Sequence, residues 1–347
     1  MILFRWERSL VSSLNFRLLI AVGATFAAQL ALCVPPAAAA AGCPAVPPAV
    51  ISLDVPRFYS DEAGTVVDPA LKSSHAKAVE PLTQFLREVV SDADHAYTRS
   101  TAKSQAEAAE CALTWLQTWA AQGAWLGTMS TKQAEYQRKW DLSGAALAYL
   151  KVRPFARPDQ RQVIEPWLQR FADTARAFFD DPTHKRNNHW YWLGLGEMAV
   201  GLGTDSPRHV DMARGIMQDA ARDIAANGTL PEEMARGQRA LFYHVFSVVP
   251  LVLMAEMATK RGEDWYALGN GAVHRLVQLS ASGLANPETF DRLASVPQER
   301  PINTRAGWLQ VYQRRFPGRL TQSLPEVAEG HRWLGGSVTV LLAALAR

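Results

Sequence analysis

The sequence has only three cysteines in 347 residues, and it contains almost no run of alternating β-branched residues. Such alternation is the mark of a half-buried β-strand, so its absence excludes sheet-based folds and predicts an all-α protein. No repeat of fixed period is visible, which disfavours a solenoid of short repeats. We therefore expect a toroid, or incomplete barrel, of antiparallel helical hairpins with a ligand cleft along one rim.

A strong charge of one sign is also missing. The formal net charge is +3, and removal of Arg5, Arg8, Arg17 and Glu7 with the leader predicted below leaves 33 basic and 32 acidic residues. A nearly neutral protein has no overall field with which to gather a polyanion. We expect no nucleic-acid partner, and any anionic ligand must be held by a local basic cluster.

Metal-ligand spacing is missing as well. Apart from His189, the histidines stand alone or in weak pairs, at positions 75, 95, 184, 209, 244, 274 and 331. A metal site needs several such ligands gathered at short spacing or in one recognisable pattern. We therefore expect neither a metal nor another cofactor.

The first 41 residues have the features of a secretory signal peptide. Three arginines precede the apolar run 18–34, and the small residues 37–42 supply a cleavage site. A membrane anchor is the alternative, but the apolar run contains Gln29 and is followed directly by Pro35 and Pro36. We predict a periplasmic, monomeric protein with one domain, 42–347, and no membrane span after cleavage.

Two cysteines, Cys43 and Cys111, remain in the mature chain. In an oxidising compartment they predict one disulfide. It would tie the proline-rich segment 43–56, which we interpret as an extended arm, to a helix. The polar segment 57–69 that follows is interpreted as a mobile, acidic loop.

Apolar residues then recur at helical spacing along the rest of the chain. The clearest case follows Asp159, where Gln162 stands at capping-box distance. Helices are expected around or within 82–89, 113–120, 136–150, 159–178, 188–202, 207 onward, 235–261, 273–284, 306–315 and 338–345.

The segment 187–192 concentrates two amides, one imidazole and three aromatic rings at the start of a predicted helix. The simplest interpretation is that Asn187 or Asn188 caps the helix and that the rings belong to the core. A second cluster makes a functional role for the Asn–His pair the better interpretation.

That second cluster contains Arg236, Arg239 and Tyr243, spaced by three and four residues, which would place them on one face of the helix 235–261. Two guanidinium groups beside a phenol suit an anion site. A solvated surface stripe is the alternative, and Glu232 and Glu233 are available as internal partners for the arginines.

Together these motifs resemble the alginate lyases of polysaccharide lyase family 5, helical (α/α) toroids that cleave poly-mannuronate by β-elimination. The matching residues cover most of the mature chain: Cys43–Pro48, Glu110–Cys111, Arg138–Trp140, Asn187–His189 with Tyr191–Trp192, and Gly228–Pro231 through Gln238–Leu241 to Tyr243–His244.

The resemblance implies roles for four residues. Asn188 and Arg236 would neutralise a uronate carboxylate, so that the neighbouring C5 proton can leave. Tyr243 could act as both base and acid on mannuronate, where the C5 proton and the C4 oxygen lie on one side, with Arg236 and Arg239 stabilising its anion. On guluronate, where they lie on opposite faces, His189 would be the natural base.

The resemblance also suggests residues that contact sugars, for each of which a surface or core role is an equal alternative: Arg239, Lys132, Gln133, Arg138 and Trp190.

One departure from the family's pattern leaves the choice of substrate open. The loop Tyr59–Asp68 is acidic, whereas mannuronate-specific relatives have basic character there, so another polyuronide such as glucuronan is an alternative. A glycoside hydrolase using Glu197, Glu232 or Glu233, and a non-catalytic periplasmic polysaccharide-binding protein, are further alternatives.

Overall fold

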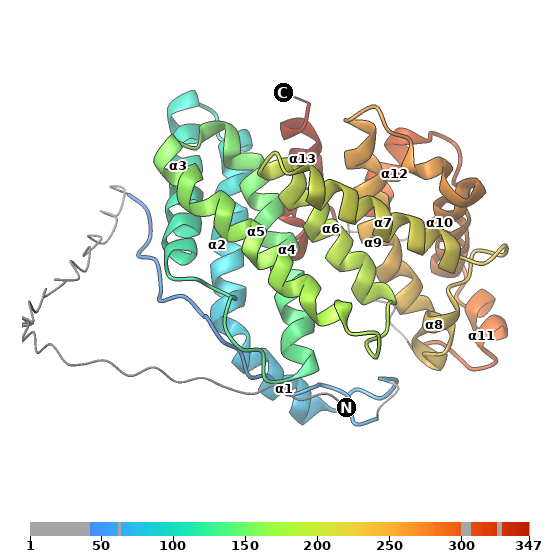
Figure 1. Ribbon diagram of the computed structural model, residues 1–347. Coiled ribbons are helices and arrows are strands. Elements are labelled where there is room, and N and C mark those ends of the chain that lie inside the picture. The colour runs from blue at the N-terminus through green and yellow to red at the C-terminus, as the bar shows by residue number, and fades with distance from the viewer. Residues whose placement is uncertain (1–41, 62–63, 300–306, 325–327, 347) are drawn as a thin grey trace, which may run out of the picture. The chain divides into compact units, whose positions relative to one another are not determined.

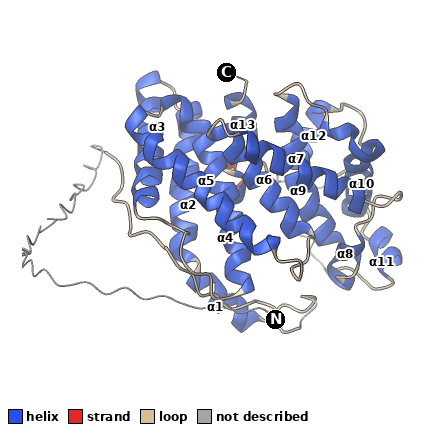
Figure 2. Ribbon diagram, in the orientation of Figure 1, coloured by secondary structure: helices blue, strands red, loops and turns tan. Residues whose placement is uncertain are grey.

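The computed structural model describes residues 42–61, 64–299, 307–324 and 328–346. Helices form nearly all of the regular structure in these residues (Figure 2), which confirms the predicted all-α class. The predicted signal peptide 1–41 and its cleavage site lie outside the described residues.

The first helices are α1 (Pro69–Ala78), α2 (Glu80–Thr98), α3 (Ala102–Ala121), α4 (Lys132–Val152) and α5 (Pro158–Asp180). The second group comprises α6 (Asn188–Gly203), α7 (Pro207–Asp223), α8 (Pro231–Met234), α9 (Ala240–Thr259), α10 (Leu268–Ala285), α11 (Glu288–Ala294), α12 (Trp308–Arg315) and α13 (Val338–Ala344). Short 3-10 turns occur at η1 (Arg153–Phe155), η2 (Gly237–Arg239), η3 (Trp265–Ala267) and η4 (Arg332–Leu334).

The long helices form two layers. Helices α2, α4, α6 and α9 pack one against the next, and α3, α5, α7 and α10 cover them (Figure 1). Helices α4, α6 and α9 are buried on nearly every side, because each has neighbours in both layers. This is why they lack the polar face of a surface helix. The segment Gly237–Thr259 is apolar and long enough to cross a membrane, but 94% of its most apolar window is buried inside the fold.

The N-terminal arm runs along the loop between α3 and α4. Backbone N–H groups of Trp125 and Gly127 donate to the carbonyls of Val50 and Ile51 at 2.9 Å, and Leu53 forms a parallel bridge with Met129. The arm is therefore extended, as predicted. Its first residue, Cys43, forms the predicted disulfide with Cys111 in α3, with the two Cα atoms 5.4 Å apart.

Removing this disulfide is expected to destabilise the protein. The pair Cys43→Ser and Cys111→Ser opens a cross-link between residues 68 apart in sequence, which enlarges the conformational freedom of the unfolded chain. We expect the free energy of unfolding to fall by about 2–4 kcal/mol. Urea unfolding followed by circular dichroism measures it, with the reduced wild-type protein as a control. An unchanged midpoint would contradict the expectation.

The C-terminal segment packs against the inner layer of helices. Strands β1 (Gly330–His331) and β2 (Gly336–Ser337) pair antiparallel around η4, and the segment packs against α2 and α4. Trp333 stacks on Trp140 at 4.6 Å, and Lys151 donates to Asp94 and to the carbonyl of Gly335. The predicted docking of 338–345 on the body of the fold is confirmed, and the segment forms helix α13. Each strand has only two residues, so no alternating pattern in the sequence could have predicted it.

One helix start differs from the prediction. Helix α5 begins at Pro158, and Gln160, not Gln162, closes the cap by accepting the N–H of Arg157 at 3.0 Å. The reason is that proline is well suited to the first helical position, where its missing N–H costs nothing. Asp159 therefore lies inside the first turn rather than before it.

Candidate active site

The first turn of α6 holds Asn188 and His189 in fixed positions. Asn187 is the N-cap, and its side-chain oxygen accepts the N–H of His189 at 3.1 Å. Asn188 is fully buried, and both its backbone N–H and its Nδ2 donate to Oε1 of Glu233, at 2.8 and 2.9 Å. The cap predicted for this stretch is thus Asn187, which leaves the amide of Asn188 for the site.

The second cluster does not lie on one continuous helix, as its spacing had predicted. Helix α8 ends at Met234, Arg236 lies in the following turn, and α9 begins only at Ala240. Gly237 has a φ of +54°, a left-handed conformation that glycine adopts without strain. The turn redirects the chain, so the relative positions of Arg236 and Tyr243 are set by the turn and not by helical periodicity.

Arg236 and Tyr243 nevertheless meet. The guanidinium carbon of Arg236 lies 4.0 Å from the centroid of the Tyr243 ring. The backbone of the 57–68 loop approaches the same guanidinium at Gly64, where an added Cβ would lie 3.1 Å from Nη1 of Arg236. A larger residue at position 64 would therefore have to displace the Arg236 guanidinium, and at a φ of +67° it would also strain the backbone.

The loop that contains Gly64 brings a further phenol, that of Tyr59, to the site. The hydroxyl groups of Tyr59 and Tyr243 lie 2.5 Å apart, and Arg239 donates to the Tyr59 hydroxyl. Gln238 also donates to the carbonyl of Thr65 at 2.9 Å. The sequence analysis missed Tyr59, although an aromatic pair, Phe58–Tyr59, in a polar loop was a usable signal.

The acidic character of this loop has a local explanation. Asp61 accepts the N–H groups of Thr65 and Val66 and the hydroxyl of Thr65. Desolvation alone would raise the pKa of Asp61, but these hydrogen bonds lower it to about 2. The Asp61 carboxylate is used in these hydrogen bonds to Thr65 and Val66. Its presence in the loop therefore does not count against an anionic substrate.

His189 packs into an aromatic wall. Its ring stacks on Tyr136 at 3.7 Å and lies 5.6 Å from Trp140. Burial, together with the positive charges of Lys139 and Arg236, lowers the pKa of His189 well below its ordinary value. The imidazole is therefore neutral near neutral pH, and within the described residues its Nδ1 is buried without a hydrogen-bond partner.

The guanidinium of Arg236 links the predicted catalytic residues, through a contact with Tyr243 and through its charge. Arg236 contacts the Tyr243 ring. Its positive charge helps to lower the pKa of His189 and opposes the rise in the pKa of Glu233, which accepts hydrogen bonds from Asn188. An amide, an imidazole, a guanidinium and a phenol in one place can neutralise a carboxylate and move a proton beside it.

The predicted sugar-contacting residues are divided. Gln133 is buried at the start of α4, and its Nε2 has no hydrogen-bond partner among the described residues, while Lys132 beside it is exposed. Arg239 forms an ion pair with Glu299 at 2.8 Å besides its bond to Tyr59. For these three residues the contact with sugars stays a prediction, and Arg239 in addition binds the loop through Tyr59.

The polar groups of Arg138 and Trp190 are used within the fold, which favours the scaffold alternative, and their contact with sugars stays an untested prediction. Arg138 donates to the carbonyls of Gly127 and Thr174 and pairs with Glu135. Trp190 donates from Nε1 to Asp219 in α7 at 2.9 Å. Their polar groups are used in holding neighbouring segments together.

The carboxylates considered for a hydrolase do not face each other across a cleft. Glu197 is buried with His209, at 2.5 Å, and Glu232 is exposed and pairs with Lys185 at 2.9 Å. Glu233 is bound to Asn188. Hydrolysis of a glycoside needs two carboxyl groups on either side of the sugar, and these three do not provide them.

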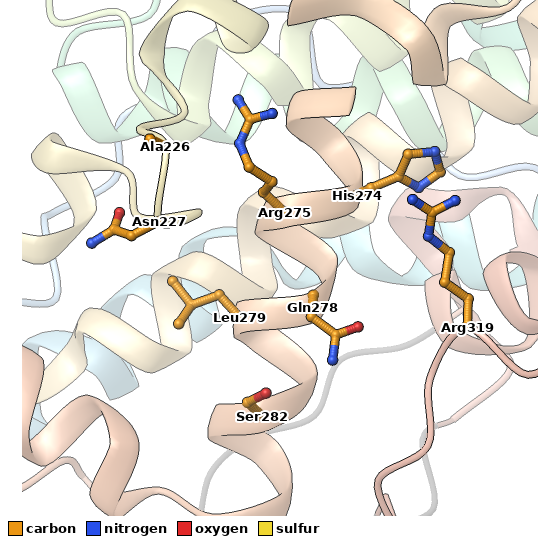
Figure 3. A pocket seen from close by; sticks show the side chains of 8 residues that line it. All are labelled: Ala226, Asn227, His274, Arg275, Gln278, Leu279, Ser282 and Arg319. Carbon is orange, nitrogen blue, oxygen red and sulfur yellow. The ribbon is translucent and has the colours of Figure 1, made fainter. Parts of the chain in front are cut away.

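A separate cavity of about 460 Å³ lies between α10 and the loop after α7 (Figure 3). It is lined by His274, Arg275 and Arg319 among others, and by none of the predicted site residues. In the part of the chain that the structure describes, no group of three or more His, Cys, Asp or Glu residues could hold a metal ion.

Comparisons with known proteins identify the family of this chain. The sequence model of the family described as Alginate lyase matches residues 53–290. A polysaccharide lyase of Stenotrophomonas maltophilia is 42% identical over 284 residues, which cover 81% of this chain and 84% of that protein. An alginate lyase of Azotobacter vinelandii is 32% identical over 287 residues, covering 79% and 76%.

Among solved structures, alginate lyase A1-III, known from Sphingomonas species A1, resembles the chain with a TM-score of 0.73 at 24% identity, over 86% of this chain and 85% of that one. The fold is therefore the (α/α) toroid, and the class of protein is a polysaccharide lyase. Within this class, the chain belongs to the alginate lyase family.

Proposed function

We propose that this protein cleaves the 1,4-glycosidic bonds of alginate, preferably poly-mannuronate, by β-elimination, and that it does so in the periplasm. The observation that carries the proposal is the contact between Arg236 and Tyr243 beside Asn188 and His189. A relative named for alginate lyase activity and a family of the same description support the substrate class.

The first task of the site is neutralisation. A proton at C5 of a uronate is barely acidic while the adjacent carboxylate keeps its charge. Arg236 and the amide of Asn188 would donate to that carboxylate and stabilise the charge that builds up as the proton leaves. Preorganised donors of this kind act most strongly where water is excluded, and Asn188 is fully buried.

The second task is proton transfer. On mannuronate, the phenolate of Tyr243, stabilised by Arg236 and Arg239, would take the C5 proton and become a phenol, while the C5–H electron pair forms the C4=C5 double bond. The C4–O bond breaks, and Tyr243 returns the proton to the leaving oxygen. The products are a new reducing end and a 4,5-unsaturated uronate end. No other reactant is needed.

His189 would help to bind the carboxylate. Its lowered pKa also keeps the ring neutral, so it retains the capacity to act as a base on guluronate. Tetrasaccharide complexes of A1-III have been solved for a tyrosine-to-phenylalanine and a histidine-to-alanine variant of that enzyme.

One assay tests the function. Purified protein is incubated with poly-mannuronate, poly-guluronate and glucuronan, and the ultraviolet absorbance of the new double bond is followed. We expect the fastest rise with poly-mannuronate. New reducing ends without absorbance would indicate hydrolysis, binding without either would indicate a polysaccharide-binding protein, and a faster rise with another polymer would correct the substrate.

Tyr59 is expected to assist Tyr243. In the variant Tyr59→Phe the 2.5 Å hydrogen bond to the Tyr243 hydroxyl is lost, while the ring remains. A hydrogen bond of about 1 kcal/mol corresponds to a fall in kcat of about fivefold. Steady-state kinetics on poly-mannuronate measures the fall. Phe58→Leu, which alters the neighbouring ring but no hydroxyl, is the matched control, and equal effects of the two changes would refute a specific role for the hydroxyl.

A further inference from the structure

One buried carboxylate beside the site has no role in the chemistry above. Glu233 is 1% exposed, and its Oε1 accepts two hydrogen bonds, both from Asn188. The adjacent Glu232 is exposed and pairs with Lys185. A carboxylate is costly to bury, and here its hydrogen bonds go to a site residue rather than to the scaffold.

The two hydrogen bonds determine how Asn188 is oriented. Oε1 of Glu233 accepts both bonds, so Nδ2 of Asn188, and not Oδ1, faces Glu233. The backbone N–H of the same residue binds the same oxygen, which fixes the amide at two points. The Nδ2 group has a second N–H besides the one that Glu233 accepts, and Oδ1 is buried with no partner among the described residues.

Glu233 is also connected to the other neutralising group. The backbone N–H of Arg236 donates to the carbonyl of Glu233 at 3.1 Å, so both residues belong to one tight turn. Burial raises the pKa of Glu233, and the hydrogen bonds from Asn188 and the charge of Arg236 oppose that rise. Glu233 therefore contacts α6 through its side chain and Arg236 through its backbone.

We propose that Glu233 is a positioning residue, which orients the amide of Asn188 toward the substrate carboxylate and fixes the spacing between Asn188 and Arg236. This inference rests on the proposed function, because it assigns Glu233 a task in the same neutralising step. It predicts that the place of the acceptor oxygen matters more than the charge of the side chain.

Two conservative variants separate these properties. Glu233→Gln keeps an oxygen at the position of Oε1 but removes the charge, whereas Glu233→Asp keeps the charge but withdraws the oxygen by one methylene. We expect Glu233→Gln to retain kcat within about tenfold and Glu233→Asp to lose about 10²-fold, because small misplacements of a binding group are costly in rate. KM should change little in either, and Glu232→Gln is the matched control with wild-type kinetics.

A double-mutant cycle gives the second measurement. If Glu233 acts through Asn188, then Glu233→Asp should cause no further loss of kcat in an Asn188→Ala background. Multiplicative losses, or a Gln variant that is folded by circular dichroism yet as slow as the Asp variant, would overturn the proposal. A wild-type protein without lyase activity would instead refute the proposed function, so the two failures are distinguishable.

Discussion

Replacing Tyr243 by phenylalanine is expected to reduce kcat on poly-mannuronate by about two to four orders of magnitude, the usual contribution of general acid–base catalysis. The phenol is the group placed to take the C5 proton and to return it to the leaving oxygen. Phenylalanine keeps the ring that packs against the guanidinium of Arg236 at 4.0 Å, so the fold and the binding cleft should remain.

The measurement has two parts. The absorbance assay gives kcat, and calorimetric titration with a mannuronate oligomer gives affinity, which we expect to stay within a few-fold of wild type. Phe242→Leu, which changes the neighbouring side chain without removing a hydroxyl, serves as control. Wild-type turnover by Tyr243→Phe would exclude Tyr243 as acid or base and transfer the proton-transfer role to His189.

The second large effect is expected for Arg236→Lys. Lysine retains a positive charge but loses the planar fork of donors that matches a carboxylate. Loss of a donor that stabilises developing negative charge typically costs about 10²–10³-fold in kcat. We therefore expect a loss of that size on poly-mannuronate, because the carboxylate would be held by Asn188 without its principal partner.

Kinetics over a range of substrate concentrations separate this loss from weaker binding. Arg319→Lys is a suitable control, because Arg319 lines the separate cavity and is exposed (Figure 3). A variant in which only KM rises would mean that Arg236 binds substrate and transition state equally, and that neutralisation is achieved by other groups.

The periodicity of apolar residues was sufficient to predict most helices, since each must bury one face or more. Periodicity led to a wrong prediction where one residue spacing is compatible both with a continuous helix and with a helix interrupted by a turn. Arg236, Arg239 and Tyr243 suit a continuous helix by their intervals, yet Gly237 has a left-handed conformation, and the chain turns there. A glycine in a sequence permits such a turn but does not require it.

Contacts between distant segments left no pattern that the sequence could reveal. Tyr59 meets Tyr243 across 184 residues, and Gly64 of the same loop approaches Arg236. The sequence also did not reveal how the polar groups of Arg138 and Trp190 are used within the fold. Trp190 follows the site residue His189, and Arg138 lies on the same helix as Gln133, but residues of one helix point in different directions, and these two side chains lead to α7 and α5.

The sequence by itself determined the all-α class, the disulfide partners, the family and the residue types of the site, because these follow from composition, periodicity and motifs. Only the tertiary structure decided which of the two adjacent glutamates is buried, which asparagine caps α6, and which phenol approaches Tyr243. These depend on the packing of α6 against the turn between α8 and α9, and that packing is a property of the folded chain.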